Sequence, residues 1–226
     1  MGHQPPKSTA PPLLRPLVAL DATISTSLHT LTRSITPRSL LLLLEFLADF
    51  RFTFPVLLSF FFVTPPSSPL RSHLLSPLLL CSLVDLLFIA LVKFLVHRSR
   101  PLYGNHDEYN AVVSVDHFSF PSGHSSRAFF IASLFHFSRL SILNSLPDLK
   151  SRAPPAVTSF LRWWIGQDDI VAVNLFLLLV WTWAVATAFS RITLGRHYVL
   201  DIFVGACLGV LEALFTLRFL RFQLLN

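Results

Sequence analysis

The sequence predicts an all-α integral membrane protein, a bundle of about five transmembrane helices preceded by an amphipathic helix. Of the 226 residues, 53% are hydrophobic and only 13% are charged, and the mean hydropathy is +0.61. A soluble domain carries about twice that share of charged residues. The apolar residues form continuous runs near the ~20 residues that cross a bilayer core as a helix. Runs of this length exclude half-buried strands, in which apolar and polar residues alternate.

The first part of the chain differs in composition from the rest. Residues 1–16 are rich in proline and polar residues and show no apolar run of the signal-peptide type, so we expect a disordered tail. Residues 17–34 mix Leu, Val and Ile with Ser, Thr and two charged residues, a pattern that allows an amphipathic helix at the membrane interface. We therefore divide the chain into an N-terminal tail with an amphipathic helix, residues 1–38, and a membrane-embedded domain, residues 39–226.

Five apolar segments follow, each long enough to span a bilayer. They cover about residues 40–63, 74–96, 121–143, 170–189 and 198–219. Ionisable side chains inside such segments are costly in lipid and usually face the bundle interior, which we expect for Asp85 and Glu212. Glu45 and Asp49 leave two alternatives open. Either the first span begins only near Phe52, or these carboxylates face the interior, which we slightly favour.

The polar residues of the membrane domain concentrate at four places. If all five segments cross the membrane, the end of the second, the start of the third, the end of the fourth and the start of the fifth lie on one side. These places read Lys93-Phe-Leu-Val-His-Arg-Ser-Arg100-Pro101, Pro121-Ser122-Gly123-His124, Ser190-Arg191 and His197-Tyr-Val-Leu-Asp201. One membrane face therefore gathers basic side chains, two histidines and a carboxylate.

The histidines suit phosphoryl transfer. His197 and Asp201 are four residues apart, so on a helix the carboxylate can accept one imidazole N–H and leave the other nitrogen free as a nucleophile or base. A second histidine, His124, can protonate the leaving oxygen. Arg191 and Arg196 add guanidinium donors for phosphate oxygens. Taken alone, this last group equally fits a basic turn at the membrane edge with a histidine at a helix start.

The two earlier groups add an anion site. Lys93 and Arg100 are seven residues apart, two helical turns, so they face one pocket if the helix continues to Pro101, which ends it. Ser122 is a good N-cap, and Gly123 lets the backbone approach a ligand closely. A helix N-terminus with free N–H groups binds anions. Cationic side chains around such a terminus suit the charge of a phosphoryl transition state.

These groups resemble the three-part signature of the type-2 phosphatidic acid phosphatase superfamily, which includes lipid phosphate phosphatases, glucose-6-phosphatase and vanadium haloperoxidases. The matching positions are Lys93 with six residues before Arg100-Pro101, Pro121-Ser122-Gly123-His124, and Ser190-Arg191 with five residues before His197 and three more before Asp201. All three parts match in order and spacing. The stretch 114–128 is similar to a narrower branch, the polyisoprenoid diphosphate phosphatases and the plant lipid phosphate phosphatases of the beta type.

The resemblance implies the fold of that superfamily and a lipid phosphate phosphatase that uses no metal and no cofactor. His197 would be the nucleophile that forms a phosphohistidine, Asp201 would orient it, and His124 would act as general acid and then as base for water. The phosphate would be bound by Lys93, Arg100, Ser122, Gly123 and Arg191. The expected partners are the bilayer and a lipid phosphate substrate, namely phosphatidate, lysophosphatidate or an isoprenoid diphosphate.

Charge and residue clustering also bear on other function classes. The net charge of +6 and the pI near 10 do not indicate nucleic acid, because the basic residues flank the apolar segments and lie in their loops. The acidic residues near the site are not clustered as Mg²⁺ sites require. A membrane transferase that moves a phosphoryl-containing headgroup through the same histidine stays open, as does a non-catalytic scaffold or channel. The modest span lengths fit the endoplasmic reticulum membrane.

Overall fold

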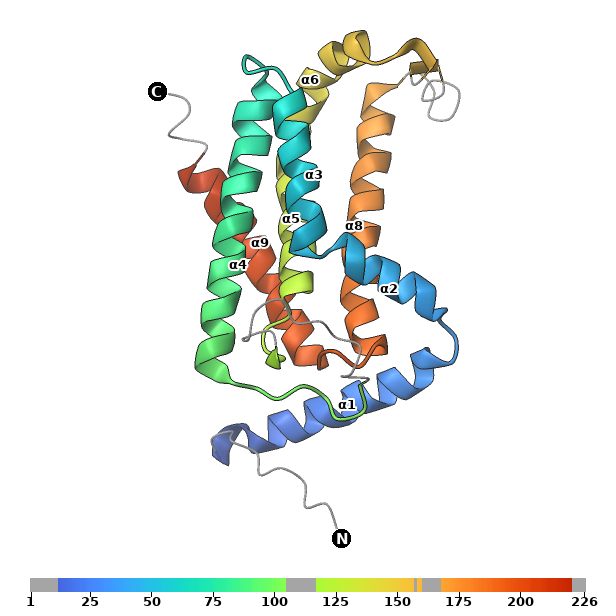
Figure 1. The fold of residues 1–226 in the computed structure, drawn as a ribbon, viewed down its shortest axis with the longest axis vertical. Coiled ribbons are helices and arrows are strands. Elements are labelled where there is room, and N and C mark those ends of the chain that lie inside the picture. Colours follow the sequence, from blue (N-terminus) through green and yellow to red (C-terminus); the bar gives the residue numbers. More distant parts are fainter. Residues whose placement is uncertain (1–11, 105–116, 157, 160–167, 221–226) are drawn as a thin grey trace.

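The computed structural model describes residues 12–104, 117–156, 158–159 and 168–220, and within these ranges every regular element is helical (Figure 1). The helices, after a 3-10 turn at Pro12–Leu14, are α1 (Arg15–Arg33), α2 (Arg38–Leu47), α3 (Phe50–Val63), a π-helical turn (Arg71–Leu75), α4 (Ser76–Val96), α5 (Gly123–Phe137), α6 (Arg139–Arg152), α8 (Asp169–Thr193) and α9 (Val199–Phe219). The all-α architecture expected from the apolar runs is confirmed.

Three of the expected spans are single long helices, and the other two are bent. The π-helical turn with α4, then α8, then α9 are each long and apolar enough to cross a bilayer. The pairs α2–α3 and α5–α6 pass the same test only when each pair is taken together, with bends of 51° and 75°. The described residues therefore hold three to five candidate spans. The first and third apolar segments are not the single runs that hydropathy alone suggests.

The bend between α2 and α3 has a local cause. Asp49 is the N-cap of α3, and its carboxylate accepts the backbone N–H of Arg51 at 2.8 Å. The N–H of Phe52 bonds to the Asp49 carbonyl at 3.1 Å, so the carbonyl of Ala48 receives no such bond from the next turn. A side chain that caps a new helix thus interrupts the run of apolar residues.

Helix α1 forms where an amphipathic helix was expected, and it crosses the end of the bundle (Figure 1). Its buried residues are polar, namely Asp21, Ser25 and His29. Apolar side chains such as Leu20 and Ile24 are exposed on it, at 57% and 43%. The polar face of this helix therefore contacts the protein. Residues 1–11 of the expected tail lie outside the described residues.

Helix α5 lies in the core and packs most extensively against α9, then against α8. Phe130 is fully buried in the main apolar cluster, to which α8 and α9 also contribute. Two glycines of α9 allow the close approach: a Cβ atom on Gly205 would lie 2.5 Å from the Ser122 carbonyl oxygen, and one on Gly209 would collide with that of Ser126. These two glycines, four residues apart, are thus a helix-packing feature.

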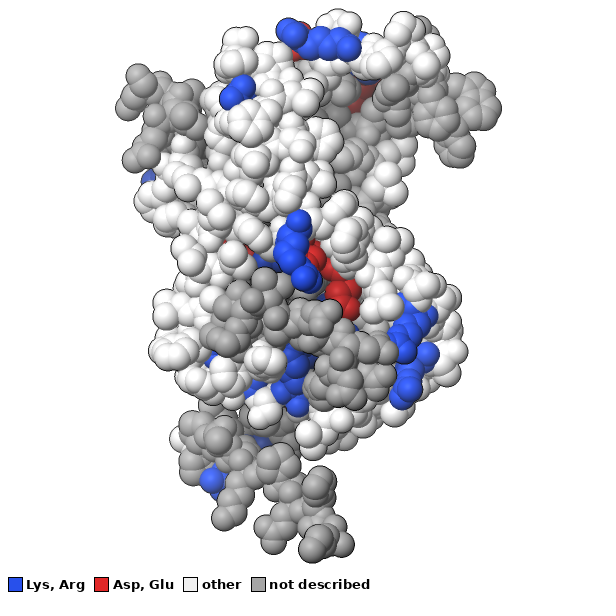
Figure 2. All heavy atoms as spheres, viewed as in Figure 1, with Lys and Arg blue, Asp and Glu red and all other residues white. Residues whose placement is uncertain are grey.

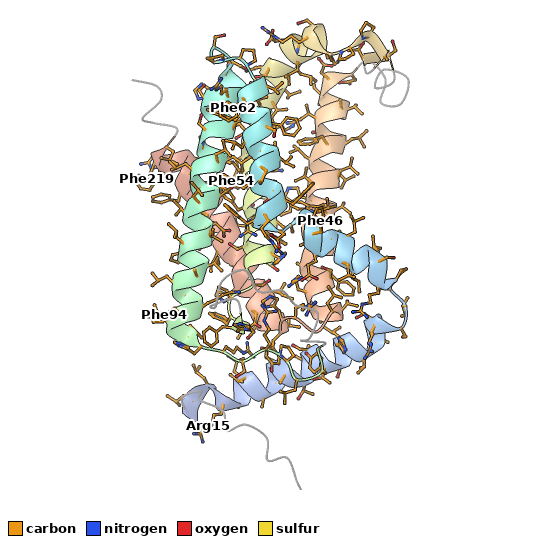
Figure 3. The ribbon with its side chains drawn as sticks, in the orientation of Figure 1. Arg15, Phe46, Phe54, Phe62, Phe94 and Phe219 are labelled. Atoms are coloured by element: carbon orange, nitrogen blue, oxygen red, sulfur yellow. The ribbon has the colours of Figure 1, made fainter. Side chains whose placement is uncertain are left out.

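The outer surface is apolar. Figure 3 shows Phe46, Phe62, Phe94 and Phe219 at the periphery of the bundle, and their exposed fractions run from 55% to 70%. On the face shown in Figure 2, most of the upper half is uncharged below a basic group at the very top, and a basic and acidic group near the middle is followed by further basic side chains in the lower half. Such a surface would be unfavourable in water, and it is the surface expected of a protein embedded in lipid.

Candidate active site

Four helix ends meet at one end of the bundle, as the topology predicted. The C-terminal ends of α4 and α8 and the N-terminal ends of α5 and α9 lie together, with α1 across them (Figure 1). One contact ties two of these ends directly: the backbone N–H of Ser122 donates to the Asp201 carbonyl at 3.0 Å. The sequence groups that are far apart along the chain are therefore neighbours in space.

Lys93 and Arg100 are both buried at this end, with exposed fractions of 3% and 8%. The expectation that one helix carries both is wrong. Helix α4 ends at Val96, and His97 adopts a left-handed conformation with φ of 51°. Arg100 follows on a non-helical segment, where its Nη1 donates to the Arg196 carbonyl at 3.3 Å. The chain thus turns inward after α4 and carries the guanidinium to the site.

The start of α5 is a capped helix N-terminus, as its sequence predicts. Ser122 is the N-cap and fully buried, and its Oγ accepts the Ser125 hydroxyl at 3.1 Å. Gly123 and His124 occupy the first turn. The Nε2 atom of His124 is buried and has no hydrogen-bond partner among the residues that the structure describes. That nitrogen is therefore available for a proton transfer.

Arg191 lies in the last turn of α8 and is fully buried. Its Nη1 atom lies 2.7 Å from Glu45 Oε1, while Nε and Nη2 have no acceptor in the described part of the chain. Glu45 also lies 3.8 Å from Arg196 Nε. The interior position that we favoured is therefore correct for Glu45, whereas Asp49 pairs with the exposed Arg51. Helix α3 begins at Phe50, close to the alternative start near Phe52.

His197 lies before α9 rather than on it, because Tyr198 is the N-cap. Its Nδ1 atom is 2.7 Å from the Ser119 carbonyl oxygen and 3.8 Å from Asp201 Oδ2. The expected one-turn helical register with Asp201 is therefore absent, and the short bond goes to a main-chain carbonyl. A carbonyl can only accept, so Nδ1 carries the proton and Nε2 keeps its lone pair.

The electrostatics of the site keep His197 neutral. The imidazole is 1% exposed, and burial lowers its pKa well below the usual value. The cations Arg100, Arg191 and Lys93 lower the pKa further, in that order. A neutral imidazole with a free Nε2 lone pair can act as a nucleophile.

Asp201 belongs to an ion network that the sequence interpretation did not include. Its Oδ2 accepts the Tyr198 N–H at 2.9 Å, and its Oδ1 accepts Arg98 Nη1 at 2.6 Å. Arg98 Nη2 reaches Asp21 of α1, also at 2.6 Å. Burial alone would lower the pKa of Arg98, but the two carboxylates raise it. The guanidinium therefore stays charged between them.

Ser119, Arg98 and Asp21 are the site residues that sequence reasoning missed. Ser119 acts through its carbonyl, which no side-chain pattern reveals. Arg98 was interpreted as a charge flanking the membrane. Asp21 lies 180 residues from Asp201 in the sequence. The one available signal was an acidic residue on an otherwise apolar and hydroxyl-rich helix.

A second polar cluster lies deeper in the bundle. Asp85 of α4 is fully buried, accepts the Ser126 hydroxyl at 2.7 Å and lies 3.3 Å from Arg127 Nη2. Arg127 Nη1 donates to the Ala48 carbonyl at 3.1 Å. Glu212 of α9 belongs to the same cluster, where its buried carboxyl group is close enough to that of Asp85 for a hydrogen bond. The interior placement expected for Asp85 is confirmed.

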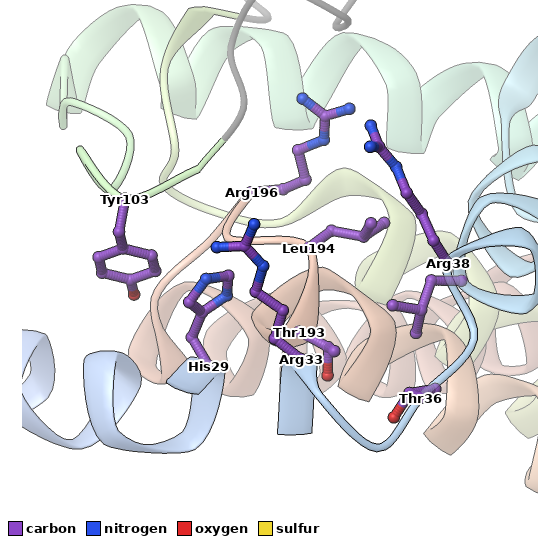
Figure 4. A pocket seen from close by; sticks show the side chains of 9 residues that line it. His29, Arg33, Thr36, Arg38, Tyr103, Thr193, Leu194 and Arg196 are labelled. Carbon is purple, nitrogen blue, oxygen red and sulfur yellow. The ribbon is translucent and has the colours of Figure 1, made fainter. Parts of the chain in front are cut away.

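A cavity of about 160 Å³ opens beside the site, between the end of α1, the start of α2 and the turn that carries His197 (Figure 4). Its lining is rich in donors, with residues His29, Arg33, Thr36, Arg38, Leu41, Tyr103, Thr193, Leu194 and Arg196. Figure 4 shows Arg33, Arg38 and Arg196 around the same space. The surroundings of this end of the bundle are therefore cationic.

Known structures share this fold. The crystal structure of the first transmembrane PAP2 type phosphatidylglycerolphosphate phosphatase from Bacillus subtilis superposes with a TM-score of 0.63, covering 91% of this chain and 86% of that one at 22% identity. The crystal structure of Aquifex aeolicus LpxE gives a TM-score of 0.50, covering 86% of this chain and 94% of that one at 20% identity. At these identities the likeness concerns the fold.

Sequence comparisons place the chain in a family. A protein described as probable lipid phosphate phosphatase beta, from Arabidopsis thaliana, is 48% identical over 96% of both chains. Lipid phosphate phosphatase gamma from the same plant is 30% identical over 52% of this chain and 41% of its own length. The model of the PAP2 superfamily matches residues 74–224, which include α4, α5, α8, α9 and every predicted site residue. The chain therefore belongs to the PAP2 superfamily.

Proposed function

We propose that this protein is an integral membrane lipid phosphate phosphatase that works through a phosphohistidine on His197. One observation carries the proposal. Arg191 is fully buried beside the two histidines, with donors on Nε and Nη2 that meet no acceptor in the described part of the chain. A buried guanidinium is stable only if something satisfies it, and a phosphate oxygen has the required charge and geometry.

The geometry suggests the first chemical step. Nε2 of His197 attacks phosphorus, and the bond from phosphorus to the leaving oxygen breaks as the N–P bond forms. His124, when it holds a proton on Nε2, donates it to that oxygen. Lys93, Arg100 and Arg191 face the charge that spreads over the equatorial oxygens. The N–H groups at the start of α5, around Ser122 and Gly123, add donors of fixed direction.

The second step reverses the roles. His124 takes a proton from water, the water oxygen attacks phosphorus, and the N–P bond breaks to release inorganic phosphate. The Ser119 carbonyl holds the Nδ1 proton throughout, which keeps Nε2 as the reacting nitrogen. Asp201 supports this arrangement from 3.8 Å and through its bond to the Tyr198 N–H. In this proposal Asp201 orients His197 mainly by fixing the backbone next to it.

The substrate class follows from the setting of the site. The site residues lie at the end of apolar helices, where a lipid headgroup would meet them. We assign phosphate monoesters or diphosphates of membrane lipids as its substrates, namely phosphatidate, lysophosphatidate and isoprenoid diphosphates. Their hydrolysis would need no metal ion. The 48% identical relative is described as a lipid phosphate phosphatase. The endoplasmic reticulum membrane is the proposed location.

The test is phosphate release by the purified, detergent-solubilised protein in EDTA, with phosphatidate and farnesyl diphosphate compared. His197→Ala should abolish release, and His136→Ala, an exposed histidine at the other end of α5, should not. The wild type should also carry an acid-labile phosphoryl label that His197→Ala lacks. Transfer to an added alcohol in preference to water would instead indicate a headgroup transferase. No release and no label from folded protein would indicate a scaffold.

A further inference from the structure

Helix α1 contacts both helices that flank the turn carrying His197. This turn, residues 194–198, connects the end of α8 to the start of α9. Much of the support of this turn comes from a helix at the other end of the sequence. The match to the PAP2 model begins only at residue 74, so α1 lies outside it.

On the α9 side, α1 provides hydrogen-bond acceptors for the helix N-terminus. Ser25 Oγ accepts the Val199 N–H at 2.9 Å, and Asp21 Oδ1 accepts the Leu200 N–H at 2.9 Å. These are first-turn N–H groups, which have no partner within their own helix. Capping normally comes from the residue just before a helix, whereas here two caps come from a different helix.

On the α8 side, α1 holds the other end of the turn. His29 lies with Nδ1 3.3 Å from the Ile192 carbonyl, and Thr32 Oγ1 lies 3.0 Å from Thr193 Oγ1. Asp21, Ser25, His29 and Thr32 are spaced three or four apart, so they form one polar stripe on α1. That stripe therefore connects both ends of the turn that presents His197.

The stripe also reaches the catalytic end electrostatically. Asp21 uses Oδ1 for the Leu200 N–H and Oδ2 for Arg98, which in turn bonds to Asp201. Ser25 is fully buried and Asp21 is 7% exposed. Buried polar groups of this kind are specific in geometry, because a displaced partner leaves an unsatisfied donor or charge.

The two faces of α1 have separate contacts. The apolar residues Leu17, Leu20 and Ile24 are exposed, as expected of a helix at a membrane interface whose apolar face meets lipid. Toward the bundle, Leu28 packs against a small apolar cluster of α8 and α9, and the polar stripe bonds to the backbone on both sides of His197. Lipid and Leu28 can hold the helix in place, whereas the directed hydrogen bonds of the stripe fix its register against the turn.

We propose that Asp21 and Ser25 are positioning residues for the nucleophile, so that α1 is part of the catalytic unit. The inference rests on the proposed phosphatase function. Loss of either acceptor frees the first turn of α9 and lets the His197 imidazole move relative to the bound phosphate. Displacements of about 1 Å in a catalytic group can cost ~100-fold in rate. Substrate binding, which depends on Lys93, Arg100 and Arg191, should change little.

The experiment compares Ser25→Ala with Ser27→Ala, a matched change on the exposed face of the same helix. Steady-state phosphate release is measured for both, together with Asp21→Ala and Asp21→Asn. We expect kcat to fall ~10-fold to ~100-fold in Ser25→Ala and Asp21→Ala, with KM within about two-fold of the wild type. Asp21→Asn keeps an oxygen for the Leu200 N–H and should fall between Asp21→Ala and the wild type. Ser27→Ala should match the wild type.

Two outcomes separate this inference from the function on which it rests. If the wild type releases no phosphate, the proposed function fails. If the wild type is active and folded Ser25→Ala and Asp21→Asn keep the kcat of Ser27→Ala, the positioning role is wrong. A rise in KM at constant kcat would also overturn it, since that pattern indicates lost substrate binding. Ser25→Ala removes a single hydroxyl, so folding of at least this variant is expected.

Discussion

Replacing Arg98 tests the ion network behind the catalytic turn. Arg98→Met keeps most of the side-chain volume and removes the cation that Asp21 and Asp201 share. Both carboxylates are almost completely buried, so neither can turn to water for compensation. The variant should therefore be much less stable than the loss of a surface ion pair would suggest.

The expected magnitude follows from the two bonds. Each is a charge-assisted hydrogen bond of 2.6 Å, and such bonds contribute ~1.5–3 kcal/mol each. The Arg98 side chain is 15% exposed, which lets solvent screen part of the interaction. We therefore take the lower half of the summed range and expect a loss of ~3–4.5 kcal/mol in the free energy of unfolding.

The assay is reversible unfolding in mixed detergent micelles, followed by circular dichroism. Arg98→Met combined with Asp21→Asn should be more stable than Arg98→Met alone, because one uncompensated charge is removed. The deficit of Arg98→Met should also be smaller at pH 5 than at pH 8, since carboxylates left without a cation take up protons more readily. A loss below ~1 kcal/mol, or a double variant less stable than the single one, would refute the reasoning.

Three further predictions concern the site and its packing. The pKa of His197 is lowered and the nucleophile must be neutral, so the acid limb of kcat/KM that is due to this group should lie below pH 6.5. Arg100→Gln removes a cation that lowers this pKa, so it should move the acid limb to higher pH in a pH–rate profile. Gly209→Ala would place a methyl group against the Ser126 carbonyl, so a stability loss of ~1–3 kcal/mol is expected in the same unfolding assay. Asp85→Asn removes the carboxylate that lies 3.3 Å from the buried Arg127 guanidinium and should cost ~3 kcal/mol of stability, which unchanged unfolding would contradict.

The sequence predicted those features that depend on long-range periodicity and spacing. Continuous apolar runs gave the all-α membrane architecture, and counting spans placed Lys93, His124 and His197 at one end of the bundle. The charges inside the spans were also informative. Asp85 and Glu45 could be assigned to the interior, because a charge facing lipid is too costly.

What the sequence did not predict depends on main-chain geometry. The Ser119 carbonyl bonds to His197 whatever side chain residue 119 carries, so no motif indicates it. The four-residue spacing of His197 and Asp201 suggested one helix face, but the helix begins two residues after His197. Likewise, the contacts of Asp21 join segments far apart in the sequence, and local pattern carries no information about them.

The break between α2 and α3 has a consequence for how this family can vary. It leaves the carbonyl of the fully buried Ala48 without a helical donor and out of reach of water, and Arg127 supplies that donor. In turn, Arg127 is tolerated there because the Ala48 carbonyl accepts a hydrogen bond from its guanidinium and Asp85 forms an ion pair with it. The unpaired carbonyl at the bend and the buried arginine each need the other as a hydrogen-bond partner. The bend, the arginine and the aspartate should therefore be inherited or lost together. Relatives in which the first span runs straight are expected to carry an apolar residue where this chain has Arg127.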